Sequence, residues 1–130
     1  MDYTSSDKRK TIAILKQIRQ AIIQLQEWNA DKQSFNDFLL SPEGNKDLAA
    51  SSMLIEAIGE GFKNVDKITD RKLLPLRSEI PWQEVKGMRD KIAHGYFDID
   101  AEIIFESVKY DLPELIPAVD YFIEQLSQDL

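Results

Sequence analysis

Hydrophobic residues recur every three or four positions along nearly the whole chain, which is the spacing of one face of an α-helix. The first such stretch predicts a long amphipathic helix that ends near Trp28 and carries its apolar stripe at Ile12, Leu15, Ile18, Ile22 and Leu25. A second stretch, roughly residues 43–65, predicts another long helix in which Gly59 and Gly61 would let a neighbouring helix approach closely. No segment alternates apolar and polar residues as a half-buried strand does.

Proline and glycine mark where the shorter helices start and stop. Residues 34–40 predict a short helix that the following Ser-Pro pair ends, and residues 66–80 predict a linker rich in Lys and Arg. Pro81 suits the first turn of a further helix, because its missing N–H is not needed there. That helix is predicted to span residues 81–94 and to end at Gly95, the favoured residue for a left-handed C-terminal cap.

The last third of the chain predicts two more helical segments. Asp98 or Asp100 can cap the first of them, and Pro113 breaks or kinks it. The clearest apolar stripe of the chain surrounds and follows this proline, at Leu112, Leu115, Ile116, Val119, Phe122, Ile123 and Leu126. These patterns predict an all-α fold, a bundle of four to six helices packed up and down around two long ones. At this length we expect one helical domain over residues 1–130.

Composition narrows the class of protein. Hydrophobic residues at 43% and charged residues at 30% are typical of a folded soluble protein rather than a disordered one. The chain has no cysteine, which excludes disulfides and thiolate metal sites. The N-terminal segment lacks the apolar core of a signal peptide, and no apolar run approaches the roughly 18 residues of a membrane span. We therefore expect a cytoplasmic protein without a membrane segment.

The net charge of −7 argues against a general nucleic-acid binder, because contacts to phosphates need cations. The charge is uneven, with 8 Lys or Arg against 5 Asp or Glu in residues 63–91, and 1 against 9 in residues 92–130. Solvated helix faces are the simplest explanation of such runs. The cations could instead form an electrostatic track for RNA, which would consist of Lys63, Lys67, Arg71, Lys72, Arg77, Lys86 and Lys91.

The stretch GMRDKIAHGYFDID, residues 87–100, contains the only histidine of the chain. Arg89 precedes His94 by five residues. A structural interpretation is available, since a protonated histidine in the last turn of a helix interacts favourably with the helix dipole, and Arg89 could be solvated or paired with Asp90 or Glu84. A chemical interpretation also fits, because the planar arginine fork matches phosphate oxygens and histidine titrates near neutral pH.

Helical spacing would place Arg89 and His94 about 140° apart, on either side of a stripe that contains Met88 and Ile92. If that stripe packed against another subunit, both polar side chains would border a shared cleft. Phosphodiester cleavage through the 2′-hydroxyl needs a general base and a general acid, and a two-fold dimer would supply two histidines. No carboxylate cluster of metal-binding character accompanies the pair, so a metal-independent reaction is the natural form.

This motif and its surroundings resemble the HEPN superfamily and, within it, the HepT-like toxins. The resemblance rests on R-D-K-I-A-H-G-Y at residues 89–96, an R-x4-H-x-Y element, together with I-P-W at 80–82 and D-L-P-E-L at 111–115. The stretch I-E-A-I-G-E at 55–60 is similar to the family's helix before the linker. In all, the resemblance covers most of residues 50–117.

The resemblance implies a small helical endoribonuclease toxin, active as a homodimer, with Arg89 and His94 as the catalytic residues of the dimer cleft and no metal cofactor. Asp90 takes the supporting polar position, where many relatives carry Asn; it could orient Arg89 or His94, yet it would repel a phosphate if unpaired. The usual partner in the family is an antitoxin, a nucleotidyltransferase of the MntA type that adds AMP to the motif's tyrosine, here Tyr96. An adduct two residues from His94 would block and repel an RNA phosphate. The structural alternative for Tyr96 is that its ring packs against the helix end.

Two other functions compete with an endoribonuclease toxin. The first is a non-catalytic helical subunit that binds a nucleotidyltransferase, which the excess of negative charge favours, whereas the Arg89, His94 and Tyr96 set favours the enzyme. The second is a dimeric interaction module in which the motif is structural. Trp82 is predicted to belong to the core rather than to a platform for stacking bases.

Overall fold

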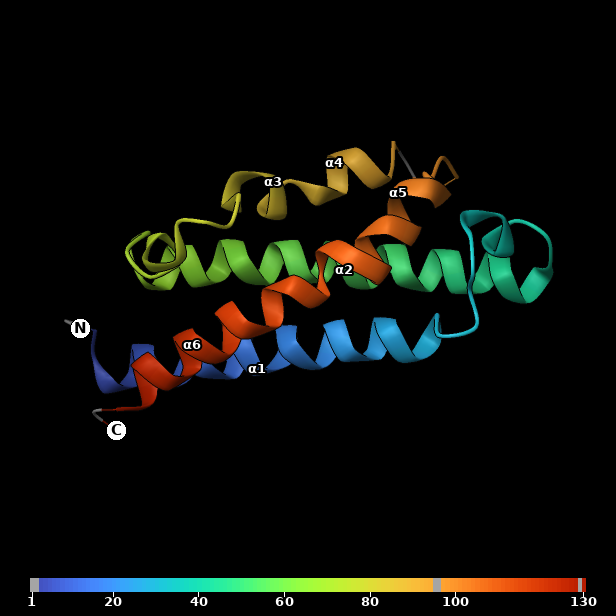
Figure 1. Cartoon of the computed structure of the whole chain (residues 1–130). Coiled ribbons are helices and arrows are strands. Elements are labelled where there is room, and N and C mark those ends of the chain that lie inside the picture. The colour runs from blue at the N-terminus through green and yellow to red at the C-terminus, as the bar shows by residue number, and fades with distance from the viewer. Residues whose placement is uncertain (1–2, 95–96, 129) are drawn as a thin grey trace.

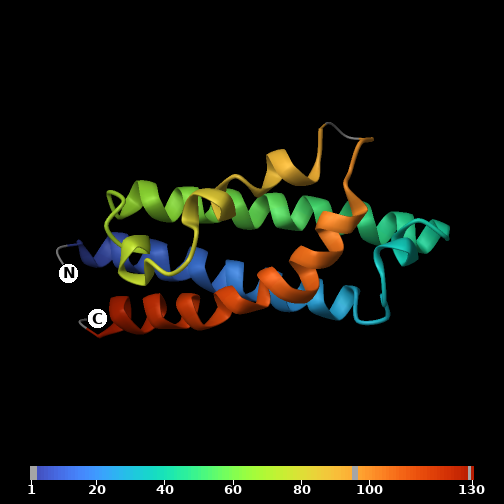
Figure 2. The same ribbon diagram turned by 45° about the horizontal axis from the view of Figure 1, so that its top comes forward.

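Two long antiparallel helices form the body of the computed structural model, which describes residues 3–94, 97–128 and 130 (Figure 1). They are α1 (Ser5–Trp28) and α2 (Pro42–Ile68). The remaining helices are α3 (Trp82–Lys86), α4 (Met88–Ile92), α5 (Ala101–Glu106) and α6 (Ile116–Ser127), with short η helices at Phe35–Phe38, Leu74–Arg77, Ser107–Asp111 and Pro113–Leu115 named η1 to η4. Both α3 and α4 pack along α2, and α6 packs along α1 (Figure 2). The predicted all-α bundle is confirmed.

The two long helices begin at capping residues. The Thr4 side chain accepts a hydrogen bond from the Asp7 N–H at 3.0 Å, and the Ser41 side chain accepts one from the Gly44 N–H at the same distance. Pro42 then occupies the first turn of α2, where its fixed φ suits a helix. The predicted end of the first helix near Trp28 is confirmed, and the predicted short helix over 34–40 is the 3-10 helix η1.

Glycines of α2 allow close packing, as their spacing predicts. A Cβ on Gly61 would lie 2.9 Å from the Ile18 side chain of α1, and a Cβ on Gly59 would lie 3.4 Å from the Lys86 carbonyl oxygen. Gly44 is the tightest of these positions, since a Cβ there would lie 2.3 Å from the Asp37 carbonyl oxygen of η1. The backbone of α2 therefore packs directly against η1 at Gly44 and against the end of α3 at Gly59, with no side chain between them.

The predicted helix over residues 81–94 is wrong in its length and its continuity. It is divided at Gly87, whose N–H donates to the Gln83 carbonyl at 3.1 Å, and its second part ends at Ile92. Ala93 is extended, with φ −150° and ψ 134°, because it forms an antiparallel bridge with Ile99. The predicted cap at Gly95 lies outside the described residues.

The C-terminal third follows the sequence pattern closely. Asp100 caps α5, since its carboxylate accepts a hydrogen bond from the Ile103 N–H at 3.1 Å. The helix then widens into the π-helical turn η3, where the Leu112 N–H donates to the Ser107 carbonyl at 2.9 Å, and it tightens into η4 at Pro113. The predicted break or kink at this proline is confirmed.

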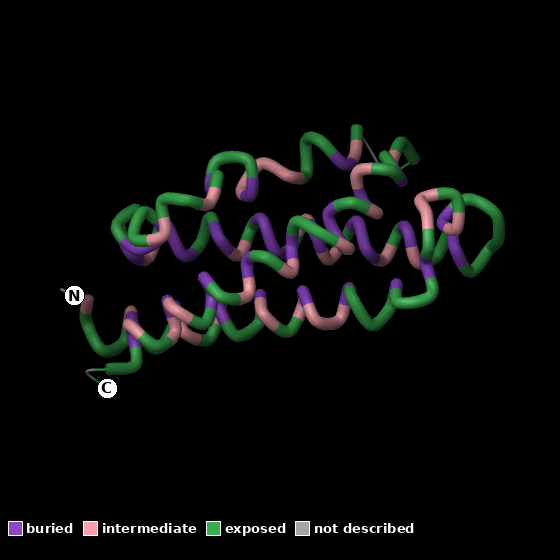
Figure 3. Tube along the Cα trace, in the orientation of Figure 1, coloured by how far each residue is buried: buried purple, intermediate pink, exposed green. Residues whose placement is uncertain are grey.

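The core lies between α1, α2 and α6, where the buried positions of each helix face inward (Figure 3). Its aromatic centre consists of Phe62, Trp82 and Phe122, with the Trp82 ring centroid 5.1 Å from that of Phe62 and 5.8 Å from that of Phe122. The Trp82 indole N–H donates to the Arg77 carbonyl at 3.0 Å, which satisfies its polar atom. The prediction that Trp82 belongs to the core is confirmed. None of the helices found in the described part of the chain is long and apolar enough to cross a membrane.

Candidate functional site

Arg89 lies on α4 and projects toward α2. Its guanidinium Nε is 3.3 Å from the Glu56 carboxylate Oε1, and the two side chains are 62% and 42% exposed. The sequence-based candidates for an ion pair with Arg89, Asp90 and Glu84, are therefore wrong. Antiparallel packing of α4 on α2 brings Glu56 to the motif across 33 positions of the sequence, and no local spacing reveals that contact.

His94 stands on a short hairpin rather than on a helix. The backbone N–H of His94 donates to the Asp98 carbonyl at 3.0 Å, and the backbone N–H of Asp100 donates to the Ile92 carbonyl at 2.8 Å. Together with the bridge between Ala93 and Ile99, these bonds fix the backbone on both sides of the loop. The His94 side chain is exposed beyond this frame.

The sequence pattern allowed the stripe of Met88 and Ile92 to pack against another subunit, and the structure corrects this. Ile92 is 1% exposed and Val85 is 7% exposed, so both belong to the core of their own chain. Met88 stays half-buried, so the stripe of Met88 and Ile92 is not an unused surface. The angle of 140° between Arg89 and His94 does not apply, because the helix ends two residues before His94.

The other two motif residues are Asp90 and Tyr96. Asp90 lies on α4 and is exposed, and among the described residues its carboxylate has no hydrogen bond or ion pair. Tyr96 lies outside the described residues, so its predicted role stays a prediction. Its neighbour Phe97 is fully exposed, at 103% of the reference area.

A groove of about 540 Å³ adjoins the motif helix between α3–α4 and α5–η4. Met88 and Lys91 belong to its wall. Its floor is apolar and its rim is largely acidic, formed by Glu79, Glu84, Glu106, Asp111 and Glu114. A hydrogen bond from Arg77 lowers the pKa of Glu79, so this part of the rim is ionised at neutral pH.

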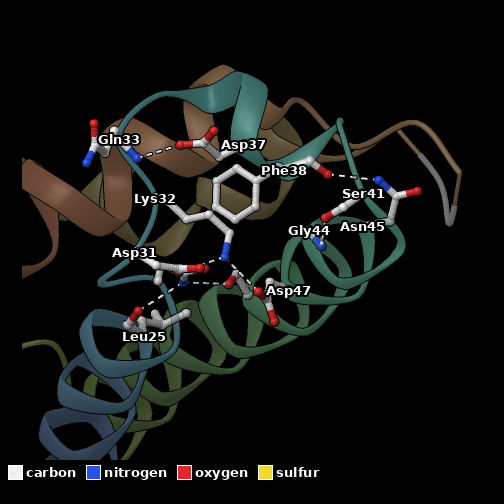
Figure 4. Close-up of polar contacts among 12 residues, drawn as sticks. Leu25, Asp31, Lys32, Gln33, Asp37, Phe38, Ser41, Gly44, Asn45 and Asp47 are labelled. Atoms are coloured by element: carbon white, nitrogen blue, oxygen red, sulfur yellow. Dashed lines mark hydrogen bonds and ion pairs between the residues drawn. The ribbon is translucent and has the colours of Figure 1, made fainter.

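A polar cluster lies in the loop between α1 and α2 (Figure 4). The buried Lys32 ammonium donates to Asp31 at 2.9 Å and to Asp47 at 2.7 Å, and it lies 5.7 Å from the centroid of the Phe38 ring. Burial disfavours the charged form of Lys32, but the hydrogen bonds to Asp47 and Asp31 outweigh it and raise the pKa of Lys32. The cluster is satisfied internally and fixes the loop. No group of three or more His, Asp or Glu side chains that could hold a metal ion occurs in the described ranges.

The seven basic residues of the predicted track do not share one surface. Lys63, Lys67, Arg71 and Lys86 border a single groove near the C-terminal end of α2. Lys91 and Arg77 line the acidic groove instead, where Arg77 pairs with Glu79 at 2.8 Å. The seven basic residues therefore do not form one continuous track on the folded chain.

The sequence of the chain is similar to that of one protein family. A family model described as "Ribonuclease HepT-like" matches residues 12–122. A protein of Caldanaerobacter subterraneus subsp. tengcongensis named as a candidate RNase is 36% identical over 92 residues, which are 71% of this chain and 76% of the relative. A Thermococcus cleftensis protein named as a probable ribonuclease HepT is 36% identical over 108 residues, 83% of this chain and 91% of the relative. No solved structure is a significant match to the chain.

Proposed function

Because the chain belongs to the ribonuclease HepT-like family, we propose that it is a metal-independent endoribonuclease in which Arg89 and His94 carry the reaction. The observation that supports this role is the exposure of both side chains on fixed backbone. Arg89 is 62% exposed on α4, and His94 is exposed on a hairpin that two backbone hydrogen bonds close. A polymer can therefore reach both groups without unfolding of the bundle.

The proposed reaction is a transesterification within RNA. The 2′-hydroxyl oxygen attacks the adjacent phosphorus, its proton passes to a neutral histidine, and a protonated histidine donates a proton to the departing 5′-oxygen. The products are a 2′,3′-cyclic phosphate end and a 5′-hydroxyl end. Arg89 stabilises the negative charge that develops on the non-bridging oxygens, since its planar fork matches two of them.

A homodimer would supply the second histidine that this scheme uses. Each chain has one histidine, so the general base and the general acid come from two copies that face each other. The exposed Phe97 ring supports a contact beside the motif, because a fully exposed phenylalanine has apolar surface to bury. Met88, half-buried on α4 next to Arg89 in the sequence, adds a second apolar side chain.

We further propose control by an antitoxin of the nucleotidyltransferase class. The Tyr96 hydroxyl would attack the α-phosphorus of ATP, forming a phosphodiester to AMP, releasing pyrophosphate and losing its proton to a base of the partner enzyme. The described neighbours of Tyr96 support access, because His94 and Phe97 are both exposed. The added negative charge would compete with RNA phosphates for Arg89.

A non-catalytic subunit is the second candidate function. The net charge of −7 and the carboxylate of Glu56 beside Arg89 favour it, because both oppose the approach of an RNA phosphate. In that case Arg89 and His94 would serve binding of the nucleotidyltransferase alone. RNA cleavage by the purified chain separates the two functions.

The deciding experiment compares the wild-type chain with His94→Ala and Arg89→Ala on a labelled RNA in the presence of EDTA. We expect cleavage by the wild type, 2′,3′-cyclic phosphate ends, and a loss in rate of about 10²–10⁴ for His94→Ala. Both substituted positions are exposed, so circular dichroism should show unchanged helix content. Cleavage that requires Mg²⁺, or that survives in His94→Ala, would contradict the proposed mechanism.

A second experiment tests the antitoxin. After co-expression with a nucleotidyltransferase of the MntA type, intact-mass spectrometry should show AMP on the wild-type chain and none on Tyr96→Phe. That variant should keep the ring and much of the RNase activity, and because it lacks the acceptor hydroxyl it should also escape inhibition. Neutralisation without any adduct would mean that the partner inhibits by covering the site.

A further inference from the structure

A basic groove of about 590 Å³ lies at the C-terminal end of α2, separate from the Arg89 and His94 side chains. Lys63 and Lys67 reach it from α2, Arg71 from the turn that follows, and Lys86 from α3. Asp66 and Asp70 are the carboxylates of its described lining, so the groove has two positive charges in excess. That excess is notable on a chain with a net charge of −7.

The pairing of these groups leaves two cations available. Lys86 donates a short hydrogen bond to Asp66, whose side chain is only 11% exposed, and this ion pair fastens α3 to α2. Lys63 pairs with Glu60 at 3.1 Å. Among the described residues, Lys67 and Arg71 have no ion pair, and both are exposed. Their charges are therefore free to attract a ligand from solution.

The backbone conformation of the turn after α2 fixes the position from which the Arg71 side chain extends. Asp70 and Arg71 have positive φ angles of 53° and 59°, a left-handed conformation that L side chains adopt at an energetic cost. The Arg71 N–H donates to the Asp66 carbonyl at 2.8 Å and holds this turn against the end of α2. The guanidinium therefore projects from a fixed turn beside the groove rather than from a flexible loop.

The groove is in line with the catalytic motif along α2. Glu56, Lys63 and Lys67 are separated by seven and four residues, so they share one face of the helix. At 1.5 Å per residue, Lys63 and Lys67 lie about 10 Å and about 16 Å along the axis from Glu56, the partner of Arg89. Gly87 lines the groove and immediately precedes α4, so the groove and Arg89 are two residues apart in the sequence.

We infer that this groove binds the phosphate backbone of the RNA strand that the motif cleaves, with Lys67 and Arg71 as the phosphate contacts. The inference rests on the proposed ribonuclease function. The distances of about 10 Å and about 16 Å from Glu56 to Lys63 and Lys67 along α2 correspond to about three to five nucleotides of a stacked strand. The contacts are to phosphates, so they add affinity and set the register of the strand without selecting bases.

The test uses the double variant Lys67→Gln/Arg71→Gln, and Lys10→Gln/Lys16→Gln as a control that removes the same charge from the exposed surface of α1. Binding of a long single-stranded RNA is measured against salt concentration, with each change placed in a His94→Ala chain to prevent cleavage. For two lost phosphate contacts, the slope of log Kd against log salt should fall by about 1.4, at about 0.7 per contact. The control should keep the slope of the parent.

Substrate length supplies a second readout in the cleavage-competent chain. The double variant should raise KM for the long RNA several-fold while cleaving a dinucleotide at the wild-type rate, because a dinucleotide does not reach the groove. An unchanged salt slope, or an equal fall in the control, would overturn the inference while wild-type cleavage still stood. A wild-type chain that neither bound nor cleaved RNA would overturn the proposed function as well.

Discussion

In the proposed mechanism, the Glu56 carboxylate competes with the RNA phosphate for the Arg89 guanidinium. The pair is too exposed to contribute more than about 1 kcal/mol to stability, so we expect its main effect to be a reduction of the positive charge that RNA would meet. Glu56→Gln should therefore lower KM for RNA several-fold, with kcat and the melting temperature nearly unchanged. Steady-state kinetics on a labelled RNA checks this. A collapse of kcat as large as that of Arg89→Ala would show that Glu56 positions the arginine.

Lys32 predicts how the stability of the 31–47 loop depends on pH. Because the folded-state pKa of Lys32 is raised above its ordinary value of 10.5, its contribution is fully present below about pH 10.5 and is lost as the pH rises through the folded value. On the acid side, the hydrogen bond to Lys32 lowers the pKa of Asp31 below its ordinary 3.8. The contribution of that carboxylate is therefore lost only as the pH falls through its lowered folded-state pKa.

The corresponding variant is Lys32→Met, which keeps the stem over Phe38 and removes the charge. It should reduce the free energy of unfolding by about 2 kcal/mol at neutral pH, less than for a fully buried pair because both carboxylates keep contact with water. Urea unfolding of wild type and variant across pH gives the difference between them. That difference should shrink above about pH 10.5, and a difference that grew there would contradict the assignment.

At the scale of elements, the contact between α2 and η1 depends on Gly44. A Cβ at this position would lie 2.3 Å from a backbone oxygen that cannot rotate away, so Gly44→Ala should destabilise the chain by about 2 kcal/mol or more. Gly61→Ala is the matched control, since its Cβ meets the flexible end of Ile18 and the alanine favours the helix. Chemical unfolding should give Gly61→Ala a clearly higher free energy of unfolding than Gly44→Ala. An equal loss of stability in the two variants would argue against a rigid contact between Gly44 and η1.

The elements that the sequence predicts well are those with local causes. The stripes of α1 and α2, the cap at Asp100 and the kink at Pro113 each depend on residues within one or two helical turns. The division of the predicted helix over 81–94 has a non-local cause. Ile92 enters the core, and the backbone beyond it pairs with residues that follow the loop, so the periodic pattern alone does not show where α4 ends.

The sequence identifies candidate residues for the site but does not show how they are arranged in space. Arg89 and His94 can be identified from residue types and spacing, as can the basic character of residues 63–91. The Glu56 contact and the selection of Lys67 and Arg71 for one groove depend on how α4 and α3 lie along α2. Those contacts join segments that are distant in the sequence, and periodicity contains no information about them.

At the scale of the whole molecule, the two-histidine scheme can be tested by mixing the wild-type chain with His94→Ala. A heterodimer of these two chains has one histidine, so it lacks either the general base or the general acid. Cleavage should therefore fall toward zero as an excess of His94→Ala replaces wild-type dimers with heterodimers under exchange conditions. The same excess of Lys10→Gln/Lys16→Gln is the control and should preserve cleavage. Full activity despite heterodimers detected by native mass spectrometry would show that one histidine is enough.

The packing of α6 on α1 affects the order in which the molecule can be completed during synthesis. Helix α1 leaves the ribosome before α6, yet the core between them needs both. Arg89 and His94 are therefore translated before the bundle that supports them can close, and the apolar side of α1 that faces α6 stays open to chaperones until residues 116–127 emerge. A chain released early would contain the whole motif without a finished scaffold to hold it.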